Sequence, residues 1–325
     1  MPSPRYVSLM LLIATTSAGL ANAQATGPGQ SYPARPIRFV TAAVGGGIDV
    51  TARLLAAGLT ERFNQQVIVD NRGGTNVAMQ TVAKAAPDGY TLLIHNNTVW
   101  ISALLEKVPY DHEKELWPIT LTTRSPNVLV VHPSLPVGSV TELIALAKSQ
   151  PGKIDYASGP IGASNHLAAE VFKSMAGIDL VRIGYKGGGP ALNDVLAGQV
   201  KVMFATSGSV MSHIQAARLK GLAVTSLEPS ALVPGLPTVA ASGVPGYSSE
   251  AIYGFWAPAK TPAGIMTRLN REAVRVLNQP DVKERFFKAG VETVGSTPEQ
   301  FAASIKAETA RLAKVLSGTG IRADK

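Results

Sequence analysis

Three segments rich in glycine and serine stand where a strand pattern gives way to a helix pattern, and their chemistry suits the binding of an anion. The first covers residues 43–49 and includes Val44, Gly46, Gly47 and Ile48. A helix start presents backbone N–H groups without partners and the positive end of the helix dipole, so it holds an anion without a cationic side chain. Glycine adds to this by letting the backbone approach a ligand closely. The first segment is therefore a candidate anion contact.

The second and third segments add side chains to the same arrangement. Residues 158–166 carry hydroxyls, an amide and an imidazole, and residues 185–190 place Tyr185 and Lys186 before three glycines. The candidate ligand-binding residues of the second segment are Ser158, Gly162, Ala163, Ser164 and His166. All three segments also have a purely structural interpretation, because tight turns need glycine at positive φ whether or not a ligand is bound. In that interpretation Lys186 is a solvated surface lysine and His166 is a capping or packing residue.

Alternating strand and helix patterns position these segments. The first group has strand patterns at 37–41, 67–70 and 90–94, with helix patterns from 49 onward and over 76–86. The second group has strand patterns at 128–131, 154–157, 180–185, 200–204 and 219–225, with helix patterns at 139–149, 163–175 and 190–197. A β-α-β-α-β order predicts parallel strands with right-handed crossovers, and ligands of such sheets gather at the carboxyl ends of the strands. The sequence therefore predicts an α/β fold.

The remaining segments complete two lobes. Residues 229–247 are rich in proline and glycine, which predicts a linker or a surface loop. A strand and three helical stretches follow, the last of which opens with a Thr-Pro-Glu-Gln capping pattern at 297–300. We expect residues 24–126 together with 255–325 to form one lobe and residues 127–254 the other. The length supports this division, because it exceeds the size at which a single hydrophobic core keeps growing.

The N-terminus predicts export. Residues 1–23 hold one positive charge at Arg5, a short apolar run and an A-x-A sequence that ends at Ala23, which is the pattern of a secretory signal cleaved there. The apolar run is too short to span a bilayer comfortably, which disfavours the alternative of a membrane anchor. Because the chain has no cysteine, we expect neither disulfides nor a lipoprotein anchor. The expected location is the periplasm.

Composition and motifs argue against several classes of function. The formal charge of +8, or +7 without Arg5, is spread along the chain and is not clustered with aromatic residues, so we expect no nucleic-acid partner. The chain has no G-x-G-x-x-G, Walker-type or G-x-S-x-G motif, and its five histidines are scattered, so we expect no catalytic residue, no metal site and no cofactor. An exported hydrolase built from residues distant in sequence stays an alternative. Trp117 and Trp256 are predicted to lie in the core or an interface, and Trp100 suits either the core or a ligand contact.

Short motifs in a fixed order give the chain a resemblance to a known family. They include Tyr32-Pro33-Ala34-Arg35-Pro36, Gly45-Gly46-Gly47-Ile48-Asp49, Pro87-Asp88-Gly89-Tyr90-Thr91, Ser164-Asn165-His166-Leu167-Ala168, Tyr185-Lys186-Gly187 and Ser296-Thr297-Pro298-Glu299-Gln300-Phe301. In order and spacing they resemble the Bug-type receptors of tripartite tricarboxylate transporters, which are periplasmic solute-binding proteins. The resemblance implies a two-lobed Venus-flytrap fold, type II-like, that closes on a small carboxylate and passes it to membrane permease subunits. We expect a monomer that is not an enzyme.

The resemblance also implies which residues meet the ligand. The first glycine loop holds a carboxylate through backbone amides and ordered water, here at Val44, Gly46, Gly47 and Ile48. The second lobe contributes Ser158, Gly162, Ala163, Ser164 and His166. The candidate set is completed by Asn96, Thr98, Tyr185 and Thr206.

Two departures from the family pattern bear on the ligand. The chain has Thr41-Ala42-Ala43-Val44 where the family has prolines before its first glycines, and Ala205-Thr206-Ser207 where an acid commonly follows the strand at 200–204. In the family that acid often pairs with a ligand amine or restrains the second lobe, so its absence favours a ligand without an ammonium group, such as a dicarboxylate or an aromatic acid. A separate alternative is that the loaded receptor binds a sensor-kinase ectodomain instead of a permease.

Overall fold

The first lobe is built on a parallel three-stranded unit. The computed structural model describes residues 32–42, 44, 47–73, 76–159 and 161–317, so the predicted signal at 1–23 lies outside the described residues. The first elements are β1 (Ile37–Thr41), α1 (Gly47–Phe63), β2 (Val67–Asn71), α2 (Val77–Ala83), β3 (Thr91–Asn96), α3 (Thr98–Leu105) and α4 (His112–Glu115). β1 lies between β2 and β3 and pairs with both in parallel, as the β-α-β-α-β order predicted.

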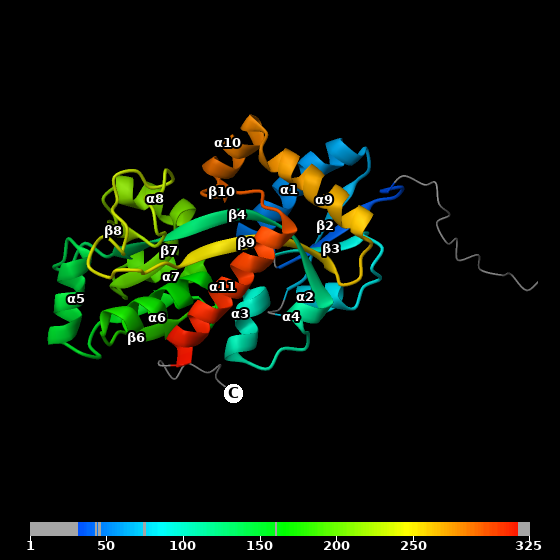
Figure 1. Cartoon of the computed structure of the whole chain (residues 1–325). Coiled ribbons are helices and arrows are strands. Elements are labelled where there is room, and N and C mark those ends of the chain that lie inside the picture. The colour runs from blue at the N-terminus through cyan, green and yellow to red at the C-terminus, as the bar shows by residue number, and fades with distance from the viewer. Residues whose placement is uncertain (1–31, 43, 45–46, 74–75, 160, 318–325) are drawn as a thin grey trace, which may run out of the picture.

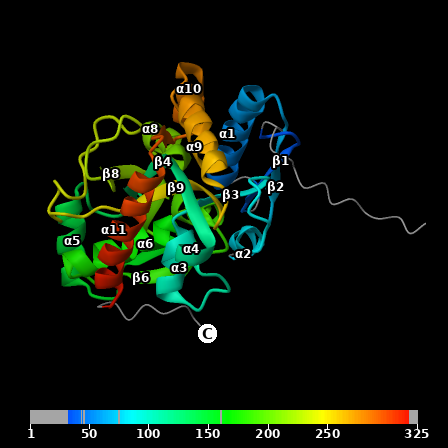
Figure 2. The same ribbon diagram turned by 45° about the vertical axis from the view of Figure 1, so that its right-hand side comes forward.

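The second lobe repeats this strand–helix alternation. It contains α5 (Val140–Ser149), β5 (Asp155–Ser158), α6 (Ser164–Ala176), β6 (Val181–Gly184), α7 (Gly188–Leu196), β7 (Val202–Thr206), α8 (Ser207–Gln215) and β8 (Lys220–Val224). The chain then returns to the first lobe with β9 (Glu250–Pro258), α9 (Ala263–Leu277), α10 (Pro280–Lys288), β10 (Glu292–Thr293) and α11 (Pro298–Ser317). The two groups lie side by side, the second lobe at the left of Figure 1, and α11 runs across the front between them in both views (Figure 1, Figure 2).

One long strand, β4 (Leu116–Val131), runs through both lobes. Its residues from Leu116 to Pro126 pair antiparallel with β9, and its residues from Asn127 to Val131 pair with β7 and β8. The change of partner falls between Pro126 and Asn127. The lobe boundaries themselves stay a prediction, and the pairing of residues 250–254 with β3 and β4 favours a return to the first lobe slightly before residue 255.

An aromatic cluster anchors α11 to the sheet. Trp100 and Trp256 are each 1% exposed, and their ring centroids lie 6.2 Å apart. Phe301 of α11 is fully buried against both rings. The expected core position of Trp256 is therefore confirmed. Trp100, for which the sequence left the core and a ligand contact open, lies in the core, whereas Trp117 is 40% exposed and lies outside it.

The predicted helix caps are present because their signals are local. Ser139 Oγ accepts from the Glu142 N–H at 3.2 Å at the start of α5. At the start of α11, Thr297 Oγ1 accepts from the Gln300 N–H, and Gln300 Oε1 accepts from the Thr297 N–H. A capping box of this kind depends only on residues within one turn.

Four features differ from the sequence-based prediction. Helices α3 and α8 and the first twelve residues of β4 were not predicted. The helices are only eight and nine residues long, and prolines and threonines obscure the two-residue repeat in this part of β4. Residues 229–247 have no helix or strand, as predicted, but they pack against the second lobe and are not a loose surface loop. Val233, Val239 and Tyr247 are buried, and the Tyr247 hydroxyl donates to the Ala168 carbonyl at 2.9 Å.

Within the described residues, no helix combines the length and apolarity needed to cross a membrane.

Replacement of Glu308 on α11 by Gln is expected to stabilise the protein at pH 8 by up to about 3 kcal/mol and to change little at pH 4.5. Burial raises the pKa of the Glu308 carboxyl from 4.5 to about 7, against the lowering effects of Asn97 and Arg311. The folded protein thus binds this proton more tightly than the unfolded chain does. The ionised carboxylate therefore destabilises the folded state above pH 7, and this destabilisation vanishes below pH 4.5. Urea unfolding at both pH values measures the difference, and equal gains at both would contradict the charge explanation.

Candidate ligand-binding site

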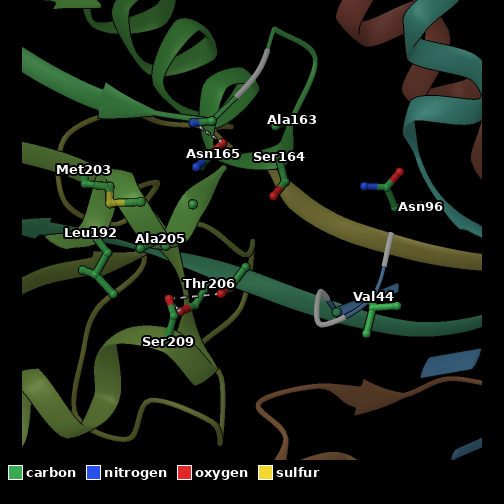
Figure 3. A pocket seen from close by; sticks show the side chains of 14 residues that line it. Val44, Asn96, Ala163, Ser164, Asn165, Leu192, Met203, Ala205, Thr206 and Ser209 are labelled. Carbon is green, nitrogen blue, oxygen red and sulfur yellow. Dashed lines mark hydrogen bonds between the residues drawn. The ribbon is translucent and has the colours of Figure 1, made fainter. Parts of the chain in front are cut away.

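A cavity of about 460 Å³ lies between the two lobes at the carboxyl ends of their strands (Figure 3). The first lobe contributes Val44, Gly47 and Asn96. The second lobe contributes Gly159, Ala163, Ser164, Asn165, Gly188, Gly189, Leu192, Met203, Ala205, Thr206 and Ser209. None of these described lining residues carries a formal charge.

Four helix starts converge on this cavity. α1 begins at Gly47 and α7 at Gly188, while Ala163 and Thr206 are the N-cap residues of α6 and α8. The N-cap residues of α6 and α8 make no side-chain capping hydrogen bond, and the N-cap residue of α7 is a glycine, which has no side chain to make one. First-turn N–H groups that lack such a partner remain available, and the dipoles of the four helices add positive potential at one place. The cavity therefore favours an anion although the described residues that line it are neutral.

Asn96 is held as a hydrogen-bond donor to the cavity. Its Oδ1 accepts from the Thr98 N–H at 3.2 Å and from Thr98 Oγ1 at 2.6 Å. Because a backbone N–H can only donate, these contacts identify the oxygen of the amide and leave its nitrogen toward the cavity, as Figure 3 shows. The buried His95 side chain lies behind Asn96, with its Nδ1 3.1 Å from both Asn96 Oδ1 and Thr98 Oγ1. Burial lowers the pKa of His95 to about 4. His95 is consequently neutral at pH 7.

Arg182 of β6 braces the second-lobe loop from behind. Its Nε donates to Ser158 Oγ at 2.8 Å, and its Nη2 donates to the Gly159 carbonyl at 2.9 Å. His166 lies in the same buried layer and accepts from the Gly162 N–H at Nδ1, at 3.3 Å. Burial and the nearby Arg182 guanidinium lower the pKa of His166 to about 4, so it too is neutral at pH 7. This layer shapes the loop whose far side, at Gly159 and Ala163, lines the cavity.

Comparison with known proteins bears on what such a cavity is for. Residues 51–321 match the model of the tripartite tricarboxylate transporter family receptor. The protein BugT of Bordetella pertussis is 33% identical over 324 residues, which cover 97% of this chain and 99% of BugT. The chain belongs to this receptor family. The resemblance drawn from the sequence motifs is confirmed.

Solved structures give the same assignment for the fold of this receptor. A structure described as R. palustris Rpa4515 with adipate superposes with a TM-score of 0.82 at 33% identity, covering 90% of this chain and 99% of that one. The periplasmic binding protein BugD superposes with a TM-score of 0.78 at 31% identity, again covering 90% of this chain and 99% of that one. The expected two-lobed α/β binding-protein fold is thereby confirmed.

The receptor cavity brings together about half of the candidate residues predicted from the sequence. Those that line it are Val44, Gly47, Asn96, Ala163, Ser164 and Thr206. Those that do not are Ile48, Thr98, Ser158, Gly162, His166 and Tyr185. Gly46 lies outside the described residues. Thr98, Ser158 and His166 lie directly behind lining residues, and the Tyr185 hydroxyl instead donates to Asp194 at 2.6 Å.

Sequence reasoning missed eight lining residues for two reasons. Gly159, Asn165, Gly188 and Gly189 lie inside the glycine-rich segments already singled out, so only the choice of position was incomplete. The other four are Leu192, Met203, Ala205 and Ser209. Met203 and Ala205 share one face of β7 through the two-residue repeat of a strand, and Ser209 lies on α8, which was not predicted. The described residues contain no group of acids and histidines arranged to hold a metal ion.

Replacement of Thr98 by Val is expected to weaken carboxylate binding by about fivefold while the protein stays folded. The substitution removes the shorter of the two hydrogen bonds from Thr98 to Asn96 Oδ1, a bond worth about 1 kcal/mol, so the amide keeps only the Thr98 N–H and is held less firmly. Replacement of Thr98 by Ser keeps the hydroxyl and serves as the matched control. Titration calorimetry of both variants measures the effect, and equal affinities would show that Asn96 needs no such support.

Proposed function

We propose that this receptor captures a small carboxylate in the periplasm and passes it to the permease subunits of a tripartite tricarboxylate transporter, without chemical change to the ligand. The observation that carries the proposal is the convergence of four helix starts on a cavity whose described lining residues are uncharged. Such a site stabilises the negative charge of a ligand carboxylate through backbone N–H groups and helix dipoles. Adipate in the Rpa4515 structure is a dicarboxylate and supports this class of ligand.

The lining also favours a ligand without an ammonium group. Leu192, Met203 and Ala205 form an apolar side of the cavity, opposite Asn96 and with Ser164 in between (Figure 3). No described lining residue is a carboxylate that would pair with an ammonium ion, and burying an unpaired charge is costly. A carbon skeleton against the apolar side with one or two carboxylates at the helix starts suits these surroundings. We therefore favour a dicarboxylate or an aromatic acid.

A titration series tests this proposal. The protein is purified from the periplasmic fraction of expressing cells, which also tests export, and is titrated with C4–C6 dicarboxylates, aromatic carboxylates and amino acids. We expect one-to-one binding of a dicarboxylate or an aromatic acid, with the ligand recovered unchanged. Tight binding of glutamate or aspartate would overturn the ligand class, and conversion of the ligand would overturn the receptor function. Light scattering of the same sample tests the expected monomer.

Delivery to a permease is tested in cells. Deletion of the receptor gene is expected to abolish uptake of the identified carboxylate, and deletion of the permease genes is expected to give the same loss. Uptake that persists without the receptor, together with a lost transcriptional response to the ligand, would favour a sensor-kinase partner.

A further inference from the structure

A buried contact joins the start of α8, in the second lobe, to a first-lobe turn between α10 and β10. The Gly290 carbonyl in this turn accepts from Ser207 Oγ at 3.1 Å and from Ser125 Oγ at 2.9 Å. Ser207 is the first residue of α8 and is fully buried, and Ser125 on β4 is 2% exposed. The Gly290 carbonyl therefore accepts one hydrogen bond from the second lobe, at Ser207, and one from the first lobe, at Ser125.

Two glycines let the backbones of these segments touch. A Cβ at Gly208 would lie 2.9 Å from the Ala289 carbonyl oxygen and 3.2 Å from Gly290 Cα. A Cβ at Gly290 would lie 2.6 Å from the Gly208 nitrogen, and its φ of +75° is itself a conformation that favours glycine. Any side chain at either position would push the start of α8 away from the first lobe.

The contact lies directly behind the cavity. Thr206 and Ser209, which flank Ser207 and Gly208 in the chain, line the cavity, while Ser207 and Gly208 do not. Thr206 is paired with Asn127, the residue at which β4 changes partner between the lobes. A displacement of this turn would thus reach one of the four helix starts and the residue at which β4 changes partner.

We propose that the Ser207–Gly290 hydrogen bond and the Gly208–Gly290 backbone contact position the start of α8 against the first lobe and thereby set the affinity for the ligand. Ser207, Gly208 and Gly290 are positioning residues, because they act through Thr206 and Ser209 and do not touch the ligand. The inference rests on the proposed ligand capture at this cavity.

A matched pair of serine variants separates positioning from stability. Ser207→Ala and Ser125→Ala each remove one buried hydroxyl from the same acceptor, so both are expected to lower the melting temperature by similar amounts. Only Ser207→Ala frees α8, so we expect it to weaken adipate binding about fivefold to tenfold, while Ser125→Ala stays within about twofold of the natural protein. Equal affinities of the two variants would overturn the inference.

A second pair of variants gives a readout that needs no ligand. Gly208→Ala is expected to speed hydrogen exchange of the amides of α8 that are hydrogen-bonded within the helix, from its second turn onward, by about tenfold or more, since the added methyl meets the Ala289 carbonyl. Gly264→Ala on α9 is the control, because a Cβ there meets nothing within 4 Å. Unchanged exchange in folded Gly208→Ala would overturn the inference. If the natural protein binds no carboxylate, the proposed function fails, and the exchange experiment still decides the contact.

Discussion

The Ala163→Asp variant is expected to be more stable than the natural protein and to bind carboxylates at least about 100-fold more weakly. Ala163 is the N-cap of α6 and lines the cavity, and its side chain makes no capping bond. Asp is among the preferred N-cap residues, and replacing Ala by such a residue stabilises a helix by about 0.5–2 kcal/mol. The introduced carboxylate occupies the N–H groups and the dipole field that the ligand uses. Two like charges about 4 Å apart repel by about 4 kcal/mol at an effective dielectric constant of 20, which accounts for the lost affinity.

The Ala163→Asn variant is the control for this prediction. Asn caps a helix as well as Asp does and is nearly the same size, but it carries no charge. We expect it to gain similar stability and to lose much less affinity. Thermal unfolding and titration calorimetry measure the two quantities separately. If both variants lose affinity equally, the ligand is excluded by volume and the electrostatic account of the cavity is wrong.

The Phe301→Ala variant is expected to lower the free energy of unfolding by about 3–5 kcal/mol. Phe301 is fully buried, with its ring centroid 5.1 Å from that of Trp256 and 6.3 Å from that of Trp100. It also fills the space left open by Gly254 of β9, where any Cβ would collide with the Phe301 ring. Removal of the ring leaves a cavity under α11, which packs on β4 and α3 of the first lobe and on α6 of the second. Urea unfolding followed by tryptophan fluorescence measures the loss.

Phe287→Ala is the control, because it makes the same substitution at an exposed position. Phe287 on α10 is 46% exposed, so its truncation creates no closed cavity and is expected to cost less than about 1 kcal/mol. Similar losses in the two variants would mean that Phe301 does not anchor α11. If the binding free energy of Phe301→Ala falls by more than its free energy of unfolding, α11 also influences lobe closure.

Local patterns explain how much of the fold was predictable. The parallel unit β1–β2–β3 and the caps at Ser139 and Thr297 follow from residues close together in the chain. The first twelve residues of β4 and helix α8 were missed because their boundaries depend on partners far away in the sequence. Ser125 and Asn127 acquire their neighbours only when β9 and β7 pair with β4. Propensity alone does not decide such elements, because tertiary packing overrides it.

For the site, the sequence by itself determined the type of chemistry. Glycine- and serine-rich helix starts at Gly47, Ser164 and Gly188 indicate anion capture, because an unpaired N–H group and a helix dipole are properties of the local backbone. Ala205 likewise showed from the sequence that the acid expected after this strand is absent.

Only the tertiary structure decided which atoms face the ligand. Hydrogen bonds from Thr98 turn the Asn96 nitrogen toward the cavity, and packing places neutral His166 behind the second-lobe loop. The fold also brings Gly290 against Gly208 of α8, although the two glycines are 82 residues apart in the chain. The physical reason is that a helix start is made by adjacent residues, whereas its direction and its neighbours depend on packing between segments distant in sequence.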